Sequence, residues 1–310
     1  MASGRYPASQ QVIEDPHDPQ HLVVRATYGL LVTRDGGGRW LLICEQAVGY
    51  GGNEDPVPAM LGGGTLMAGI FGGLALAPAD GCNWRLAQGG VSEMEIVDVS
   101  VDPVERARGL ALGVRTQRGL HTHRLWETAD SGASWQRLGG LFGAELDLLA
   151  TAFDAAPSDR KRIYVSGVGA VLRVQGVLLR TDNGGVTWTV LPIADTGPSA
   201  IPFLTAVASN DRDTIYVRVR ASAGDRLLVS SDAGQSWRSV LERQAVMAGF
   251  ALSTDGTELA SASGCPIGRA RSTAACWASG KRPRGISCSA RSSMVQFSVL
   301  HGPSAACTLA

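Results

Sequence analysis

The sequence predicts an all-β fold built from one structural unit that is repeated along the chain. Two observations support this prediction. An eight-residue pattern, Ser/Thr-x-Asp-x-Gly-x-x-Trp, occurs five times, and its tryptophans are 44, 51, 53 and 49 residues apart. Each copy lies between two apolar runs, such as GLLV before the first copy and LLICE after it, which indicates a hairpin. A repeat of this length is typical of a propeller or a solenoid.

Each of the four specified positions of the pattern has a role in a tight turn. The acid accepts bonds from backbone N–H groups ahead of it, the glycine takes a positive φ, the hydroxyl closes the loop, and the tryptophan packs between units. The five copies are TRDGGGRW (Thr33–Trp40), APADGCNW (Ala77–Trp84), TADSGASW (Thr128–Trp135), TDNGGVTW (Thr181–Trp188) and SSDAGQSW (Ser230–Trp237). The residues expected to stabilise these turns are Thr33, Asp35, Gly37, Trp40, Gly81, Trp84, Thr128, Asp130, Gly132, Trp135, Thr181, Asn183, Gly185, Trp188, Ser230, Asp232, Gly234 and Trp237. We interpret them as structural and not as catalytic.

Two copies depart from the pattern. Asn183 replaces the acid in the fourth copy and keeps an acceptor oxygen. In the second copy, Ala77 and Ala79 replace the hydroxyl and the acid, and Asp80 comes one place late. Four intact or nearly intact copies remain, which argues against a chance repeat.

The pattern resembles the Asp-box, also called the bacterial neuraminidase repeat. The resemblance covers about residues 11–258 and implies a β-propeller of four-stranded antiparallel blades with about one box per blade. The chain is similar to the sortilin-type and photosystem II assembly-factor-type propellers in its repeat pattern only, so this resemblance transfers no functional residue. It also implies a secreted, periplasmic or cell-surface protein. The start, MASGRYPASQQ, has no signal-peptide pattern, so we expect that a leader was removed or is missing from the gene model.

The chain divides by composition at about residue 258. Residues 11–258 hold five recognisable blades and the start of a sixth, whereas residues 259–310 contain no Asp, Glu, Asn or Tyr but six basic residues and four of the six cysteines. Residues 1–258 carry a net charge of 22 − 28 = −6, which the tail balances with +6. We interpret this tail as the product of a frameshift near Gly264, or as disordered, and the propeller as incomplete at its C-terminus. A genuine basic extension is the alternative.

Several classes of partner are not expected. The net charge is zero, which does not favour nucleic acid or an anionic membrane, and the basic string KRPR at 281–284 is too short for a nucleic-acid patch. The uncharged stretch TLMAGIFGGLALAPA is interrupted by glycines and runs into the second box, which favours two blade strands over a membrane span. No cofactor is expected, because GGGTLMAGIFGG lacks the strand–turn–helix frame of a dinucleotide site.

Cysteine and histidine pairs were the other candidates for chemistry. Cys44 and Cys82 lie in equivalent outer regions of adjacent blades, so a disulfide and two unpaired thiols are both open. The four tail cysteines form no C-x-x-C pair, which does not support a zinc site. His121 and His123 would face the same way on a strand as a conceivable metal pair, but we expect a solvent-facing strand edge.

The remaining question is catalysis. Sialidases with this repeat use an arginine triad and an Arg-Ile-Pro signature; the corresponding strand reads LVVRATYG and offers only Arg25. The candidate acids outside the boxes are Glu54, Asp55, Glu93, Glu95 and Asp98. Glu93 and Glu95 would share one strand face, which we interpret as solvated, and we expect none of the five to be catalytic. The sequence therefore favours a non-catalytic scaffold or binding module with an unknown protein or glycan ligand. The alternative is a glycan-acting hydrolase with an unrecognised carboxylate pair.

Overall fold

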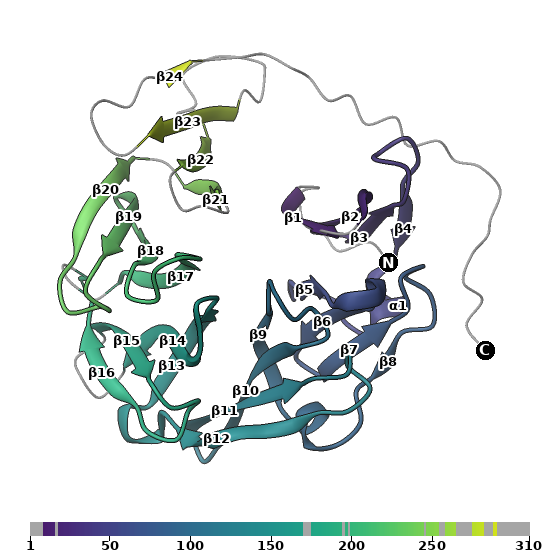
Figure 1. Ribbon diagram of the computed structural model, residues 1–310, viewed down its shortest axis with the longest axis horizontal. Coiled ribbons are helices and arrows are strands. Elements are labelled where there is room, and N and C mark those ends of the chain that lie inside the picture. Colours follow the sequence, from purple (N-terminus) through teal and green to yellow (C-terminus); the bar gives the residue numbers. More distant parts are fainter. Residues whose placement is uncertain are drawn as a thin grey trace. The chain divides into compact units, whose positions relative to one another are not determined.

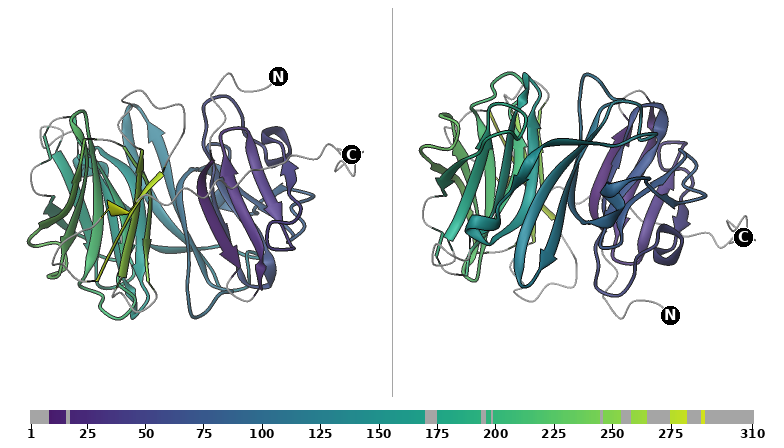
Figure 2. Two further views of the ribbon diagram at one scale, coloured as in Figure 1. Left: turned by 90° about the horizontal axis from the view of Figure 1, so that it is seen from above. Right: turned by 90° about the horizontal axis from the view of Figure 1, so that it is seen from below.

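The chain folds almost entirely into short antiparallel sheets. A computed structural model describes residues 9–15, 18–169, 175–193, 196–197, 199–244, 246–253, 258–264, 275–281 and 288–289. Within these residues the strands form six four-stranded sheets, and strands adjacent in sequence are adjacent in each sheet (Figures 1 and 2). The fold is therefore all-β, with the four-stranded blades of a propeller, as the repeat predicts.

The blades are numbered along the chain. Blade 1 contains β1 (Ser9–Asp15), β2 (Asp18–Ala26), β3 (Gly29–Thr33) and β4 (Leu41–Ile43); blade 2 contains β5 (Val57–Met60), β6 (Leu66–Ile70), β7 (Gly73–Ala77) and β8 (Arg85–Leu86). Blade 3 contains β9 (Glu95–Val101), β10 (Gly109–Gln117), β11 (Leu120–Thr128) and β12 (Gln136–Phe142); blade 4 contains β13 (Leu148–Ala156), β14 (Asp159–Gly169), β15 (Gln175–Thr181) and β16 (Thr189–Pro192). Blade 5 contains β17 (Ile201–Val207), β18 (Ile215–Ala221), β19 (Gly224–Ser230) and β20 (Arg238–Arg243); blade 6 contains β21 (Met247–Leu252), β22 (Glu258–Gly264), β23 (Ala275–Lys281) and β24 (Cys288–Ser289). The connections hold the short helix α1 (Glu45–Val48) and the 3-10 turns η1 (Gly62–Gly64), η2 (Gly90–Glu93) and η3 (Ala144–Leu146).

The described residues belong to two compact units, which we describe separately. Unit 1 holds residues 9–115 and 125–137, that is, blades 1 and 2 and most of blade 3. Unit 2 holds residues 116–124 and the described residues from 138 onward, that is, the remainder of blade 3 and blades 4 to 6.

The second and third strands of blade 2 explain the long uncharged stretch of the sequence. All residues of β6 (LMAGI) and β7 (GLALA) are buried, because these strands lie in the middle of the sheet and are covered on both faces. The prediction of two consecutive blade strands is confirmed. In the described part of the chain, no helix is long and apolar enough to cross a membrane.

Apolar clusters fill the space between consecutive blades. In unit 1, one cluster joins β2 and β3 of blade 1 to β6 of blade 2 through residues such as Leu30 and Ile70. In unit 2, another joins β14 and β15 to β17 and β18 through residues such as Leu178 and Val217. Burial of these faces stabilises the fold at about 25 cal/mol per Å² of apolar surface, so each blade depends on its neighbours.

The first strands of several blades share a β-bulge at a similar place. The register skips Val97 in β9, Thr151 in β13 and Thr205 in β17. A bulge adds one residue to one strand of a pair and bends it. Its recurrence shows that the repeat extends over the whole blade and is not limited to the turn motif.

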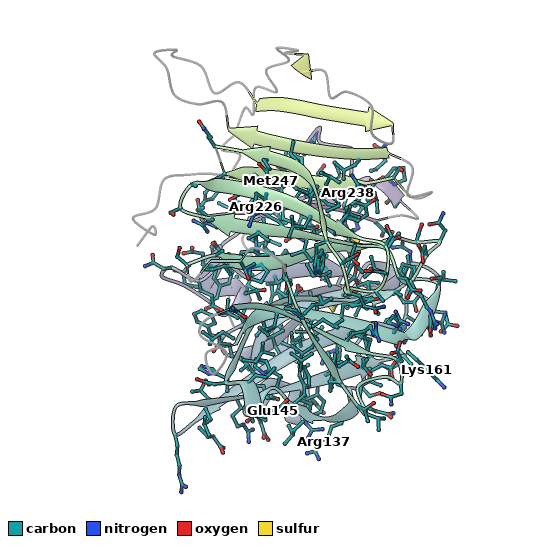
Figure 3. The ribbon with its side chains drawn as sticks, turned by 90° about the vertical axis from the view of Figure 1, so that its left-hand side faces the viewer. Arg137, Glu145, Lys161, Arg226, Arg238 and Met247 are labelled. Atoms are coloured by element: carbon teal, nitrogen blue, oxygen red, sulfur yellow. The ribbon has the colours of Figure 1, made fainter. Side chains whose placement is uncertain are left out.

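The turns of each antiparallel blade fall at two ends. We call the "box edge" the end with the third-to-fourth-strand turns, where the boxes lie, and the first-to-second-strand hairpins. The "loop edge" is the opposite end, with the second-to-third-strand hairpins and the connections into the next blade. Glu145, in the connection from β12 to β13, and Lys161, whose carbonyl accepts the Gly184 N–H of the fourth box at 3.0 Å, lie toward opposite sides of Figure 3.

The sixth blade begins as the sequence predicts, with β21 and β22. The tail adds two strands that its composition does not predict: β23 pairs with β22 from Glu258↔Lys281 to Gly264↔Ala275, and β24 pairs with β23. The side chains of β23 and β24 lie outside the described residues, as do residues 282–287. The frameshift and the interpretation of KRPR stay predictions.

Candidate functional site

Four of the five boxes have the same hydrogen bonds, which use up the polar groups of the turn. In the third box, Thr128 Oγ1 donates to Asp130 Oδ1 at 2.7 Å and accepts the Gly132 N–H at 2.9 Å, while the Ser134 N–H donates to Asp130 Oδ1 at 2.9 Å. The first, fourth and fifth boxes repeat these three bonds at 2.7–2.9 Å. Their acids and hydroxyls face the turn and not a ligand.

The second box has the altered turn that its sequence indicates. Asp80 Oδ1 accepts the Cys82 N–H at 2.9 Å, and the Gly81 carbonyl accepts the indole N–H of Trp84 at 2.8 Å. The missing hydroxyl at Ala77 leaves no counterpart of the Thr128 bonds. An Asx turn one residue late therefore takes the place of the full box.

Two of the box tryptophans, Trp188 and Trp237, contact the last strand of the preceding blade. The ring of Trp188 lies 4.4 Å from that of Phe142 on β12, measured between centroids. The indole N–H of Trp237 donates to the Pro192 carbonyl of β16 at 3.2 Å. Each of these two side chains thereby joins its own blade to the one before it.

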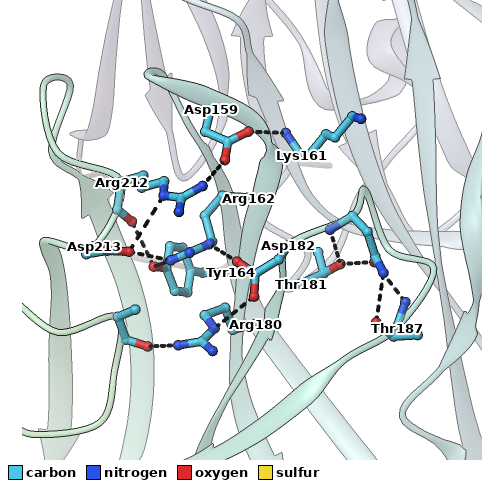
Figure 4. A network of polar contacts seen from close by, with 12 residues as sticks. Asp159, Lys161, Arg162, Tyr164, Arg180, Thr181, Asp182, Thr187, Arg212 and Asp213 are labelled. Atoms are coloured by element: carbon cyan, nitrogen blue, oxygen red, sulfur yellow. Dashed lines mark hydrogen bonds and ion pairs between the residues drawn. The ribbon is translucent and has the colours of Figure 1, made fainter.

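A buried arginine connects blades 4 and 5 beside the fourth box (Figure 4). The Arg162 side chain is 6% exposed and forms ion pairs with Asp182 and with Asp213, the latter at 2.6 Å. It also donates to the Tyr164 hydroxyl at 2.8 Å, and this hydroxyl donates to the Arg212 carbonyl at 2.7 Å. Burial lowers the pKa of Arg162, but the bonds to Tyr164 and the two aspartates outweigh it, so the net shift is upward.

This network is a structural connection and not an anion site. Three arginines gather there, but each already faces a carboxylate: Arg180 contacts Asp182 at 3.4 Å and Arg212 contacts Asp159 at 2.5 Å. The network could not be predicted from the sequence, because its members lie up to 54 residues apart. The one signal present is the charged residue Arg162 at the start of the apolar run RIYVSGV.

The candidate acids of unit 1 are dispersed over its loop edge. Glu93 lies in η2 and pairs with Arg115 at 3.2 Å, whereas Glu95 begins β9 and is exposed. Asp55 accepts the side-chain amide of Gln10 at 3.1 Å, and Asp98 Oδ1 accepts the N–H of the following residue at 2.9 Å. The expectation that Glu93 and Glu95 share one strand face is wrong, because the strand begins only at Glu95.

Glu54 is the one acid of this set whose side chain is buried. It is 8% exposed, and its carboxylate accepts the backbone N–H of Phe71. Burial raises its pKa, and the nearby charge of Glu95 adds to the shift. Arg25, the remaining sialidase candidate, donates to the Pro56 carbonyl at 2.9 Å and is held by the backbone.

His121 and His123 lie in different surroundings. His123 is 1% exposed, so the expectation of a solvent-facing strand edge is wrong for it. His121 is half-buried, and its Nδ1 lies 2.8 Å from Asp147 Oδ1. The sequence did not indicate this contact, because Asp147 follows 26 residues later. Among the described residues, no group of three His, Cys, Asp or Glu side chains could hold a metal ion.

Of the two alternatives for Cys44 and Cys82, a mutual disulfide and two unpaired thiols, neither holds. Cys44 is an exposed free thiol, and Cys82 is bonded in a disulfide to another cysteine. The neighbourhood was anticipated correctly, since a Cβ on Gly81 would lie 2.3 Å from Ile43 Cδ1. The direction in which the Cys44 side chain points was not anticipated. Successive side chains of extended backbone point to opposite sides, so Ile43 faces the second box and Cys44 faces solvent.

Comparisons with known proteins support the fold and leave the activity open. No protein-family model and no curated protein matches the sequence. The structure is similar to a GH74 enzyme of Niastella koreensis (TM-score 0.61, 14% identity, 90% of this chain and 46% of the enzyme) and to an ancestral GH74 enzyme (TM-score 0.63, 13% identity, 93% and 38%). It is also similar to a gluconolactonase of Xanthomonas campestris (TM-score 0.53, 12% identity, 84% of each chain).

The chain spans less than half of the length of each of the two GH74 enzymes. Chains of such low identity share the propeller fold without sharing a function. The same architecture therefore serves glycoside hydrolases and a lactonase, and the site residues of this chain have to be judged on their own contacts.

Proposed function

We propose that the chain is an exported, non-catalytic propeller that binds a glycan or protein ligand through the loop edge of unit 1. The supporting observation is the contrast between the two edges. At the box edge, Asp35 and Asp130 accept hydrogen bonds from their own turns. At the loop edge, Phe71 is 64% exposed and Tyr28 is 37% exposed. Exposed aromatic side chains are favoured in binding surfaces.

The backbone beneath Phe71 is held in place, which suits a binding residue. Phe71 lies at the tip of the hairpin between β6 and β7, two fully buried strands. The Glu54 carboxylate accepts its N–H and joins the hairpin to the connection from blade 1. An aromatic ring on a rigid support loses little conformational entropy when a ligand covers it. Sugar rings and aromatic peptide side chains are the groups that such a ring accommodates best.

A glycan array and a peptide array tested with the purified full chain would examine this proposal. For any ligand found, Phe71→Ala should weaken binding at least about tenfold, the effect of losing one good contact of about 1.4 kcal/mol. The matched control is Val104→Ala, which shortens a side chain that is 74% exposed at the box edge of the same unit. Equal loss from both substitutions, or from neither, would argue against the loop edge as the binding surface.

One observation favours the alternative, a glycan-acting hydrolase. Such enzymes pair a carboxylic acid of raised pKa with an ionised carboxylate, and Glu54 has a raised pKa with Glu95 nearby. We give it second place because the Glu54 carboxylate is buried and already bonded to Phe71. Chromogenic glycosides decide between the two: turnover that Glu54→Gln abolishes would make the chain an enzyme, and absence of turnover on a panel that includes the array ligand would favour binding.

A further inference from the structure

The loop edge of unit 2 holds a buried histidine whose ring nitrogens approach a polar group only at the backbone of Phe142. His123 lies on β11, 1% exposed, with its ring 5.6 Å from that of Phe142. Neither ring nitrogen makes a hydrogen bond of ordinary geometry. The backbone of Gly143 lies against the ring, since a Cβ there would be 2.9 Å from Nδ1. An imidazole in this position packs as an apolar ring and has no place for a charge.

The chain that covers this histidine is a tight connection from Gly143 to Leu148. Gly143 and Asp147 both have positive φ, 87° and 45°, and the N–H groups of Leu146 and Leu148 both donate to the Gly143 carbonyl, at 3.2 and 3.0 Å. A non-glycine residue in the left-handed region is strained. The conformation of Asp147 therefore depends on the contacts that surround it.

His121, two residues earlier on β11, supplies one of these contacts. Its Nδ1 lies 2.8 Å from Asp147 Oδ1. The bond from His121 lowers the pKa of Asp147, so this carboxyl stays ionised in mildly acidic solution. His121 thus ties the connection to β11 through the Asp147 carboxylate.

The charged groups on the elements around His123 do not favour its protonation. β11 carries His121, whose charge opposes a second one, and Arg124 follows His123 directly. The connection carries Glu145 and Asp147, the latter bonded to His121; β12 carries Arg137, which lies over Trp126. Phe142 and Leu148, the residues next to the ring, do not titrate.

We propose that the connection Gly143–Leu148 is an acid-released latch, held closed by neutral His123 and opened when His123 gains a proton. Protonation places an uncompensated charge against Phe142 and Gly143, and the ring leaves its site. The connection then detaches from the ring but stays tied to β11 through His121 and Asp147. Opening changes the loop edge of unit 2 and goes beyond the proposed binding function.

The pH range of the latch follows from linkage. Burial first, and the charge of His121 second, lower the pKa of His123 to about 4 from 6.5, and they outweigh the bond with the Phe142 backbone, which raises it. The closed form is then fully stable above pH 6.5 and weakens as the pH falls toward 4. A difference of about 2.5 pKa units changes the opening constant by up to about 300-fold, of which about half is reached at pH 4.

Amide hydrogen exchange of the full chain at pH 7, 5.5 and 4 tests the latch, with rates corrected for the intrinsic effect of pH. We expect protection in residues 142–148 to fall by about 150-fold between pH 7 and pH 4, while the turn at 208–214 keeps its protection. His123→Phe retains an aromatic ring that cannot be protonated and should abolish the change. His121→Asn should lower protection at every pH and leave the pH dependence in place.

Constant protection of residues 142–148 in the wild type would overturn the proposal, and so would an unchanged pH dependence in His123→Phe. If that variant does not fold, the NMR titration of the His123 ring in the wild type serves instead. A midpoint near 4 that coincides with the loss of protection supports the latch, and a midpoint near 6.5 without loss of protection overturns it.

Discussion

Replacing Thr128 by valine removes the hydroxyl of the third box and leaves its shape almost unchanged. Thr128 is 1% exposed, and its Oγ1 is the acceptor for the buried N–H of Gly132 at 2.9 Å. An orphaned buried N–H costs about 1–3 kcal/mol. The lost bond to Asp130 adds little, because water reaches that carboxylate. We expect the free energy of unfolding to fall by about 2 kcal/mol and Tm to fall by about 3 °C, because a chain of 310 residues has an unfolding entropy of about 0.65 kcal/mol per K.

Thermal unfolding followed by circular dichroism measures this change. The control is Thr128→Ser, which keeps the hydroxyl and loses one methyl group, at a cost of about 0.8 kcal/mol or less. Amide exchange of Gly132 should rise in the valine variant and stay near the wild-type rate in the serine variant. If valine is tolerated as well as serine, the box hydroxyl does not stabilise its turn and the structural interpretation of Thr128 fails. A variant that keeps the wild-type Tm but binds its ligand more weakly would refute the structural interpretation of Thr128 more strongly.

Three further predictions concern single residues. Bonds from Ser236 and Ser230 lower the pKa of Asp232 to about 2 from 3.8, so the contribution of this carboxylate to stability is present above pH 3.8 and is lost as the pH falls toward 2. Asp232→Asn should therefore reduce the pH dependence of unfolding over that range. An unchanged pH dependence below pH 3.8 would contradict this prediction. Gly234→Ala should lower Tm, because φ is +91° and a Cβ would lie 2.5 Å from Leu178 Cδ2. The control is Gly197→Ala, whose Cβ meets no atom within 4 Å and which should leave Tm unchanged. Equal effects of the two substitutions would show that neither the space nor the positive φ at Gly234 causes the loss of stability. Cys44 is exposed and free, so the native chain should react with a thiol reagent and Cys44→Ser should lose that fast reaction; a full rate in the variant would assign it elsewhere.

The turns could be predicted from the sequence because every interaction in them is local. Thr181 and Asn183 meet Gly185 and Thr187 within seven residues of chain, so spacing alone determines which groups can bond. The strands on either side follow from apolar runs of the length that a blade requires. The altered second box obeys the same local rule, since Ala77 has no hydroxyl to offer.

The contacts between distant segments could not be predicted in the same way. His121 meets Asp147 only because the loop edge brings a hairpin and a connection together, and Arg162 meets Asp213 only because blades 4 and 5 are neighbours. The disulfide alternative failed for a related reason. Adjacent blades place Cys44 and Cys82 in neighbouring regions, but one residue of strand alternation decides whether a thiol faces its neighbour or solvent.

The repeat does not indicate the function of the chain, and the reason is physical. A box has few polar groups, and Asp130 shows where they go: its carboxylate accepts the N–H of Ser134 and the hydroxyl of Thr128 within its own turn. Groups bonded in this way would lose those bonds in order to meet a ligand. The functions proposed above therefore rest on the loop edges of the two units. In unit 1, Phe71 is exposed and Glu54 is buried with a raised pKa; in unit 2, His123 is buried with a lowered pKa. These residues belong to no repeat, so measurements on them, and not on the boxes, test the proposals.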